Sequence, residues 1–157
     1  MSRFCYTKDE FLLDGKAFQI RSGAIHYFRM PREYWYDRLL KLKECGFNCV
    51  ETYLAWNLHE PEENVFRFDG NLDFIRFIQT AKDLGLYAIV RPGPFICAEW
   101  EAGGLPAWLL RYEDVHIRCN NAVFVEKAKK YLDTVLPMIR PYCIEEGGNV
   151  IMVQIEN

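Results

Sequence analysis

The stretch that decides the fold runs from Asn48-Cys-Val-Glu-Thr-Tyr53 to Leu86-Tyr-Ala-Ile-Val-Arg91. Both ends are short apolar runs typical of buried strands. The residues between them include a helical pattern over 72–84, with apolar side chains spaced for one face and Gly85 directly after it. A strand, a helix and a second strand in this order form a right-handed crossover between parallel strands. We therefore predict an α/β fold with a parallel sheet.

The same unit recurs on both sides of this stretch. Upstream, the pattern predicts a strand over 20–26 and a helix that begins at Pro31 and ends at Gly46. Downstream, a loop over 92–120 leads to a helix over 121–139 and a fourth strand over 150–157. The aromatic residues at helical spacing are expected in the core: Trp35, Phe74 and Phe77.

Four such strands suit either a small doubly wound sheet or half of an eight-stranded barrel. No G-x-G-x-x-G or Walker-type loop follows any strand, and the long loops all follow strands while the returning turns are tight. This pattern favours a (β/α)8 TIM barrel, of which only the first four strands and three helices are present. A short β-hairpin precedes it, because Asp14-Gly15 lies between apolar runs and both residues tolerate the positive φ of a type I′ turn. We divide the chain into this hairpin, residues 1–19, and a partial barrel, residues 20–157.

Composition limits the classes of function. The 19 basic and 22 acidic residues are well mixed and give a formal net charge of −3, which indicates binding neither to nucleic acid nor to an anionic membrane. The first ten residues contain no apolar stretch, so we expect no signal peptide and a cytoplasmic protein. The six cysteines lie far apart without a C-x-x-C pair, which favours buried thiols over disulfides.

Metal, cofactor and serine chemistry are not expected. The three histidines, His26, His59 and His116, lie far apart and show no metal-ligand spacing such as H-E-x-x-H. Neither serine lies in a G-x-S-x-G motif. We therefore expect no metal site, no cofactor and no serine nucleophile.

Polar side chains gather at the predicted strand ends. Glu51 and Tyr53 share a face of the second strand, Arg91 ends the third, and the fourth carries Gln154, Glu156 and Asn157. Carboxylates and amides beside aromatic rings suit a carbohydrate, whose C–H face packs on a ring while its hydroxyls form hydrogen bonds.

Some of these polar and aromatic residues also have structural interpretations. We expect Arg91 to pair with Glu51 or Glu99. The loop tryptophans either form a binding wall or pack the loops: Trp56, Trp100 and Trp108. A cluster of carboxylates is expected on a solvated loop face: Glu60, Glu62 and Glu63.

Five motifs at these strand ends carry a family resemblance. They are Gly23-Ala-Ile-His-Tyr-Phe-Arg29, Glu51-Thr-Tyr-Leu-Ala-Trp-Asn-Leu-His-Glu-Pro61, Arg91-Pro-Gly-Pro-Phe-Ile-Cys-Ala-Glu-Trp100, Gly103-Gly-Leu-Pro-Ala-Trp-Leu-Leu110 and Val153-Gln-Ile-Glu-Asn157. From about Phe11 onward the chain resembles the β-galactosidases of glycoside hydrolase family 35. The resemblance implies a (β/α)8 barrel that hydrolyses terminal β-D-galactosyl bonds with retention, using one glutamate as acid/base and another as nucleophile.

The resemblance also implies where the site residues lie. The acid/base glutamate is expected immediately after Asn157 and the nucleophile after the seventh strand, so neither lies within the 157 residues. Substrate binding is implied for Tyr53, for Cys97, Ala98 and Glu99, and for Asn157, the last near the 2-hydroxyl. Glu156 is not expected to be catalytic, because on a pleated strand it would point to the opposite face from Asn157.

These inferences predict a β-galactoside as the ligand and no hydrolysis by the isolated chain. The open edges of the first and fourth strands favour self-association. Two alternatives stay open. One is a non-catalytic sugar-binding or assembly fragment, and the other is a retaining hydrolase of the same clan that acts on another β-linked sugar.

Overall fold

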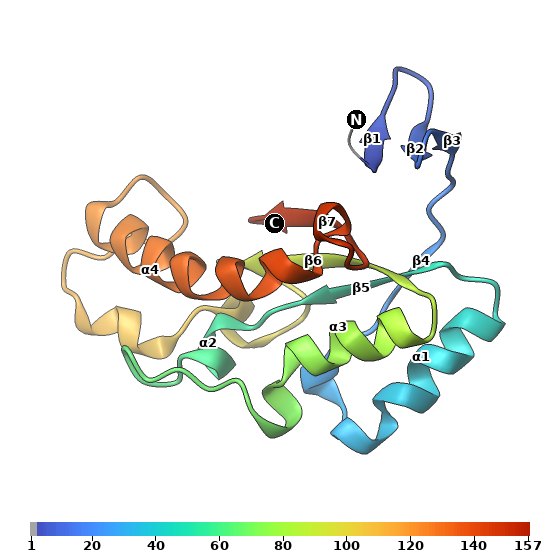
Figure 1. Cartoon of the computed structure of the whole chain (residues 1–157). Coiled ribbons are helices and arrows are strands. Elements are labelled where there is room, and N and C mark those ends of the chain that lie inside the picture. The colour runs from blue at the N-terminus through green and yellow to red at the C-terminus, as the bar shows by residue number, and fades with distance from the viewer. Residues whose placement is uncertain (1–2) are drawn as a thin grey trace.

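A parallel sheet of four strands in the order β4-β5-β6-β7 forms the centre of the structure (Figure 1). The computed structural model describes residues 3–157. The strands of this sheet are β4 (Ser22–Ala24), β5 (Cys49–Tyr53), β6 (Tyr87–Gly93) and β7 (Val150–Ile155). Each strand pairs in parallel with the next one along the chain, as in one half of an α/β barrel. The parallel sheet predicted from the sequence is confirmed.

The connections between the parallel strands carry the helices. The α-helices are α1 (Trp35–Glu44), α2 (Trp56–His59), α3 (Phe74–Asp83) and α4 (Ala122–Ile139). Short 3-10 helices lie at Tyr27–Arg29, Arg32–Tyr34, Gly70–Leu72, Glu101–Gly104, Ala107–Arg111, Arg140–Tyr142 and Ile144–Glu146. The three long helices are those predicted from the sequence, whereas α2 was not predicted because four residues carry no helical period.

Local chemistry sets the helix boundaries. The Asp73 carboxylate accepts a hydrogen bond from the Arg76 amide at 2.9 Å, which caps the start of α3. Asn121 caps α4 in the same way through the Phe124 amide at 3.0 Å. Gly85 ends α3 with a φ of 75°, a left-handed conformation that favours glycine.

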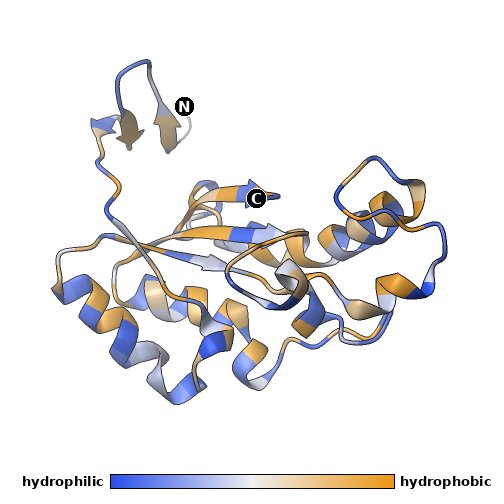
Figure 2. Ribbon diagram, turned by 180° about the vertical axis from the view of Figure 1, so that it is seen from behind, coloured by the Kyte–Doolittle hydropathy of each residue, from blue (hydrophilic) through white to orange (hydrophobic). Residues whose placement is uncertain are grey.

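The main core lies between the helices and one face of the sheet. The strands contribute Val50, Ala88, Val90 and Val150, which pack with the apolar faces of α1, α3 and α4. The aromatic residues expected in this core, Trp35, Phe74 and Phe77, are at most 2% exposed. Figure 2 shows apolar residues concentrated along the strands and on the helix faces directed at them.

The N-terminal sheet is antiparallel and lies toward the amino ends of the parallel strands (Figures 1 and 2). It has three strands, β1 (Phe4–Tyr6), β2 (Phe11–Leu13) and β3 (Lys16–Ala17), whereas the sequence predicted a two-stranded hairpin. The predicted turn is confirmed, with φ values of 49° and 78° at Asp14 and Gly15. Met1 and Ser2, part of the predicted segment 1–19, lie outside the described residues.

All six cysteines are free thiols, so the sequence correctly disfavoured disulfides. Burial was predicted wrongly for three of them, since Cys45, Cys97 and Cys119 are exposed. Each of these three lies outside the strands and outside the buried faces of the long helices. Among residues 3–157, no helix has the length and apolarity that a membrane span requires.

Candidate functional site

The carboxyl ends of β5, β6 and β7 meet around one arginine. Arg91 lies opposite Tyr53 in the register of β6 with β5. Its guanidinium donates to the Glu51 carboxylate at 2.8 Å and to the Tyr53 hydroxyl, and it donates to Asn157 Oδ1 at 2.6 Å. The guanidinium carbon also lies 4.2 Å from the centre of the Tyr53 ring. One side chain thus holds polar groups from three strand ends in a single cluster.

The ion pair expected for Arg91 forms with Glu51 rather than with Glu99. The Arg91 and Glu51 side chains are 15% and 27% exposed, so the pair is partly shielded from water. Such a pair orients its members more than it stabilises the fold, because desolvation of both charges offsets much of their attraction. The sequence predicted this pair but did not predict that the same guanidinium also bonds Tyr53 and Asn157.

The contacts of Arg91 determine what Tyr53 and Asn157 can offer a ligand. A guanidinium only donates, so the Asn157 atom facing it is the carbonyl oxygen, and the amide nitrogen is left to donate elsewhere. The Tyr53 hydroxyl accepts from Arg91 and keeps its own proton to donate. Burial raises the pKa of Tyr53, and the Arg91 charge opposes this rise, so the phenol is neutral near pH 7.

The third predicted element of the site is the segment Cys97–Glu99, which lies in the loop after β6. Its residues Cys97, Ala98 and Glu99 have φ values of 54°, 51° and 46°. A left-handed conformation costs a residue with a side chain about 1–2 kcal/mol. Three in succession therefore require support from the surrounding structure. Cys97 and Glu99 are exposed, while Ala98 is buried under the loop.

The loop returns to the sheet through a close contact at Gly103. The Ile96 amide donates to the Gly103 carbonyl at 2.8 Å, and Gly103 has a φ of 60°. A Cβ at this position would lie 2.0 Å from Cε2 of Phe95, so only glycine fits without a shift of the ring. The segment Cys97–Glu99 is thereby confined to a short turn above the sheet.

Two of the three loop tryptophans pack the protein interior. Trp56 and Trp108 are 0% and 4% exposed, and their indole nitrogens donate to the Glu60 carboxylate at 2.6 Å and the Glu60 carbonyl at 2.8 Å. The prediction that Glu60 lies on a solvated face is wrong. Its side chain is buried because the indole of Trp56 and the amide of Asn64 satisfy both carboxylate oxygens. Trp100 is half-buried at the strand ends, where it donates to Asn57 Oδ1 at 3.2 Å.

Glu156 and Asn157 bond different parts of the site. The predicted strand over 150–157 ends at Ile155, and Glu156 has a φ of 63°, so the alternation of a pleated strand does not apply there. The Glu156 carboxylate accepts from the Phe95 amide at 3.1 Å and from Arg118 at 3.0 Å. Asn157 instead faces Arg91. That Glu156 is not catalytic stays a prediction, and its present contacts suit a role in holding the loops.

The histidines occupy three different environments. His26 lies at the strand ends, with its ring centre 4.9 Å from that of Tyr53, and burial lowers its pKa, as does the nearby Arg29 charge. Its Nδ1 atom is buried without a hydrogen-bond partner in the described part of the chain. His59 lies in the core and His116 is exposed. Over residues 3–157, no three His, Cys, Asp or Glu side chains are grouped to hold a metal ion.

Sequence reasoning missed His26 and Arg29 as residues of this site. Both follow β4, where the predicted strand over 20–26 gives way at Ala24 to an irregular turn. The motif Gly23–Arg29 was noted for its resemblance, and that resemblance was the one available signal. Neither periodicity nor spacing places these side chains beside the loop after β6.

The fold is that of part of an α/β barrel. The structure matches the GH5_18 protein of Streptomyces cattleya in complex with GlcNAc, with a TM-score of 0.68 and 17% identity, over 90% of this chain and 34% of that one. It also matches the exo-β-1,4-mannosidase Op5Man5 of Opitutaceae bacterium strain TAV5, with a TM-score of 0.66 and 18% identity, over 91% of this chain and 25% of that one. The predicted partial barrel is confirmed.

The sequence identifies the family. Residues 10–157 match the family model described as Glycosyl hydrolases family 35, and the chain belongs to this family. It is 52% identical to human beta-galactosidase-1-like protein 3, over 96% of this chain and 23% of that protein. It is 48% identical to mouse beta-galactosidase, over 97% of this chain and 24% of that protein. The chain thus spans about a quarter of the length of these relatives.

Proposed function

We propose that the protein containing these residues hydrolyses terminal β-D-galactosyl bonds with retention, and that residues 1–157 form part of its galactose site. The observation that carries the proposal is the cluster in which Arg91 orients Tyr53 and Asn157 at the carboxyl ends of adjacent strands. This is the rim on which barrel enzymes carry their active sites. Relatives named beta-galactosidase support galactose as the sugar.

The exposed groups of the site complement a sugar. Tyr53 and Asn157 each accept from Arg91 and so present donors, the phenol O–H and the amide N–H, to sugar hydroxyls. Glu99 is exposed, and no group within residues 3–157 donates a hydrogen bond to its carboxylate, so it can accept from two adjacent hydroxyls. Cys97 and Ala98 complete the turn that places Glu99. Trp100 adds an aromatic surface next to this turn.

We also propose that residues 1–157 by themselves do not catalyse hydrolysis. Retention requires two carboxyl groups about 5–5.5 Å apart on either side of the scissile bond. The Glu51 carboxylate is bound by Arg91, and the Glu156 carboxylate by the Phe95 amide and Arg118. The resemblance to family 35 implies that the acid/base is the glutamate expected after Asn157 and that the nucleophile belongs to a later strand.

The test compares the 157-residue chain with the complete product of its gene, using a chromogenic β-galactoside. We expect hydrolysis by the complete product, with the β-anomer of galactose appearing first by NMR, and a large loss in its Glu99→Ala variant. We expect no turnover by the isolated chain above that of its own Glu99→Ala control, and binding of galactose weaker than millimolar by calorimetry. Turnover or tighter binding by the isolated chain would contradict the proposal.

Two outcomes would favour the alternatives. Preference of the complete product for another β-linked sugar would indicate a different hydrolase of the same clan. Galactose binding without turnover by the complete product, together with a dimer of defined mass, would indicate a sugar-binding or assembly role. The sheet edges β4 and β7 are the surfaces through which we propose self-association of the isolated chain, and Val153 and Ile155 on β7 are 38% and 50% exposed.

A further inference from the structure

We infer that Arg29 is a positioning residue that holds the segment Cys97–Glu99 in its binding conformation. This inference rests on the proposed function, because it concerns the loop that carries Glu99. Arg29 ends the short 3-10 helix after β4, while the loop follows β6, and β5 lies between these two strands in the sheet. The Arg29 side chain therefore extends past the end of β5 to contact the loop.

The contacts of Arg29 are directed at the loop backbone and at aromatic rings. Its Nη2 donates to the Ala98 carbonyl and, at 3.3 Å, to the Glu99 carbonyl. Its guanidinium carbon lies 5.5 Å from the centre of the Trp100 ring and 6.0 Å from that of Phe28. The Phe28 and Trp100 rings themselves meet edge to face at 4.9 Å.

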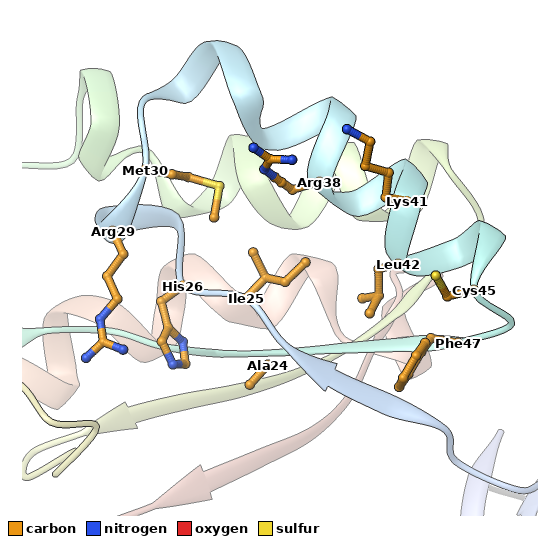
Figure 3. Close-up of a pocket in the computed structure, with 10 residues that line it drawn as sticks. All are labelled: Ala24, Ile25, His26, Arg29, Met30, Arg38, Lys41, Leu42, Cys45 and Phe47. Carbon is orange, nitrogen blue, oxygen red and sulfur yellow. The ribbon is translucent and has the colours of Figure 1, made fainter.

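The direction of the side chain agrees with this role. Figure 3 shows Arg29 and His26 extending together at the end of the groove toward which the strands point, whereas Arg38 and Lys41 lie along α1. No carboxylate among residues 3–157 forms a salt bridge with Arg29, so its charge acts on two carbonyls and two rings instead. A guanidinium suits this arrangement because its planar fork can donate to adjacent acceptors while its face stacks on an aromatic ring.

The loop needs such an anchor because of its backbone conformation. Three consecutive left-handed residues persist only where neighbouring groups fix them. The hydrogen bonds within the turn, from the Trp100 amide to the Cys97 carbonyl and from the Gly103 amide to the Trp100 carbonyl, both at 2.9 Å, close it on one side. Arg29 supplies the contact on the other side, at the carbonyls of Ala98 and Glu99.

Hydrogen exchange tests the anchor without any sugar. In the complete gene product, we expect Arg29→Ala to speed exchange of the Trp100 and Gly103 amides about tenfold or more, because two hydrogen bonds and a stacking contact are lost. Arg29→Lys should give a smaller increase. The matched control is Arg38→Ala, which removes a guanidinium lining the same groove but touching no loop residue, and should leave both amides unchanged.

The Ala88 amide in β6 separates local release from general loosening. It donates to the Asn149 carbonyl in the core, and its exchange should not change in any of these variants. Unchanged exchange at Trp100 and Gly103 in Arg29→Ala would overturn the inference. An equal increase at Ala88 would also overturn it, since Arg29 would then only stabilise the fold.

Fluorescence and kinetics supply two further readouts. Trp35, Trp56 and Trp108 are at most 4% exposed, so among the tryptophans of residues 3–157 acrylamide reaches mainly Trp100. The part of the quenching that is lost on Trp100→Phe should therefore increase in Arg29→Ala. The KM for the β-galactoside should rise about tenfold with a smaller change in kcat, because Arg29 orients a binding loop, and Arg29→Lys should restore part of the loss. A fall in kcat at unchanged KM would contradict a positioning role.

If the wild-type protein binds no galactoside, the proposed function fails, while the exchange experiment still decides the role of Arg29.

Discussion

Acid should destabilise this fold through the buried side chain of His59. His59 is 0% exposed, and its Nδ1 lies 2.8 Å from the Arg67 carbonyl, which can only accept. Nδ1 therefore carries the proton, and Nε2 accepts from the Tyr27 hydroxyl at 2.5 Å. The neutral ring satisfies both contacts. A second proton, on Nε2, would point at the Tyr27 hydroxyl, which donates its own hydrogen to Nε2 in the neutral state. Burial accordingly lowers the pKa of His59 to about 4.

The magnitude follows from the difference between folded and unfolded states. The ordinary histidine pKa is 6.5, so between pH 6.5 and about 4 the unfolded chain binds a proton that the folded chain does not. The stability from His59 is therefore present above pH 6.5 and is lost as the pH falls. From pH 7 to pH 5 the free energy of unfolding should decrease by about 2 kcal/mol from this residue, and by about 3 kcal/mol once pH 4 is reached.

Urea unfolding at pH 7 and pH 5 measures this loss. We compare the wild-type chain with His59→Gln, which retains a donor for the Arg67 carbonyl and an acceptor for Tyr27 but does not titrate. The decrease between the two pH values should be smaller in His59→Gln by about 2 kcal/mol. The control is His116→Gln, because His116 is exposed and this variant should behave as the wild type. Equal decreases in the wild type and in His59→Gln would refute the assignment of the acid sensitivity to this ring.

Three other substitutions have expected outcomes. Gly103→Ala places a Cβ 2.0 Å from the Phe95 ring, at a residue with a left-handed backbone. The loop should therefore shift and the KM of the complete product should rise. Unchanged kinetics would contradict this prediction. Glu60→Gln turns one buried acceptor into a donor that faces an indole or amide N–H, and urea unfolding should show a loss of about 1–3 kcal/mol. Arg91→Met leaves Glu51 without its cation and should cost about 2 kcal/mol in urea unfolding, less than a fully buried pair because Glu51 is 27% exposed. The same variant should raise the KM, and equal affinity to the wild type would show that Arg91 does not orient the site.

Elements with a strong period could be predicted from the sequence. The long helices show one apolar face each, and their caps and stops are short-range signals, as at Asp73 and Gly85. The order of strands followed from the alternation of strand and helix. The strand bounds were less certain because burial on both sides leaves no alternation, and the last strand was extended by two residues beyond Ile155.

Loop residues could not be placed because their environment depends on distant parts of the chain. Glu60 looked solvated in sequence, beside two other acidic residues, yet its partners include Trp108, 48 positions away. Tyr53 and Arg91 were accessible to sequence reasoning, since adjacent parallel strands bring their carboxyl ends together. Arg29 was not, because its contact crosses a strand and depends on three left-handed residues without glycine.

The two arginines orient the hydrogen-bonding groups of the site. Arg91 directs its terminal nitrogens at Glu51, Tyr53 and Asn157, and Arg29 directs its own at backbone carbonyls of the loop. The charge of Arg91 is balanced by Glu51, and the exposed carboxylate of Glu99 at this rim would repel an anion. A neutral polyol meets the reverse situation, because its hydroxyls can donate to Glu99 and accept from the groups that Arg91 orients. These contacts support the proposed uncharged sugar by an argument that does not depend on the family of the chain.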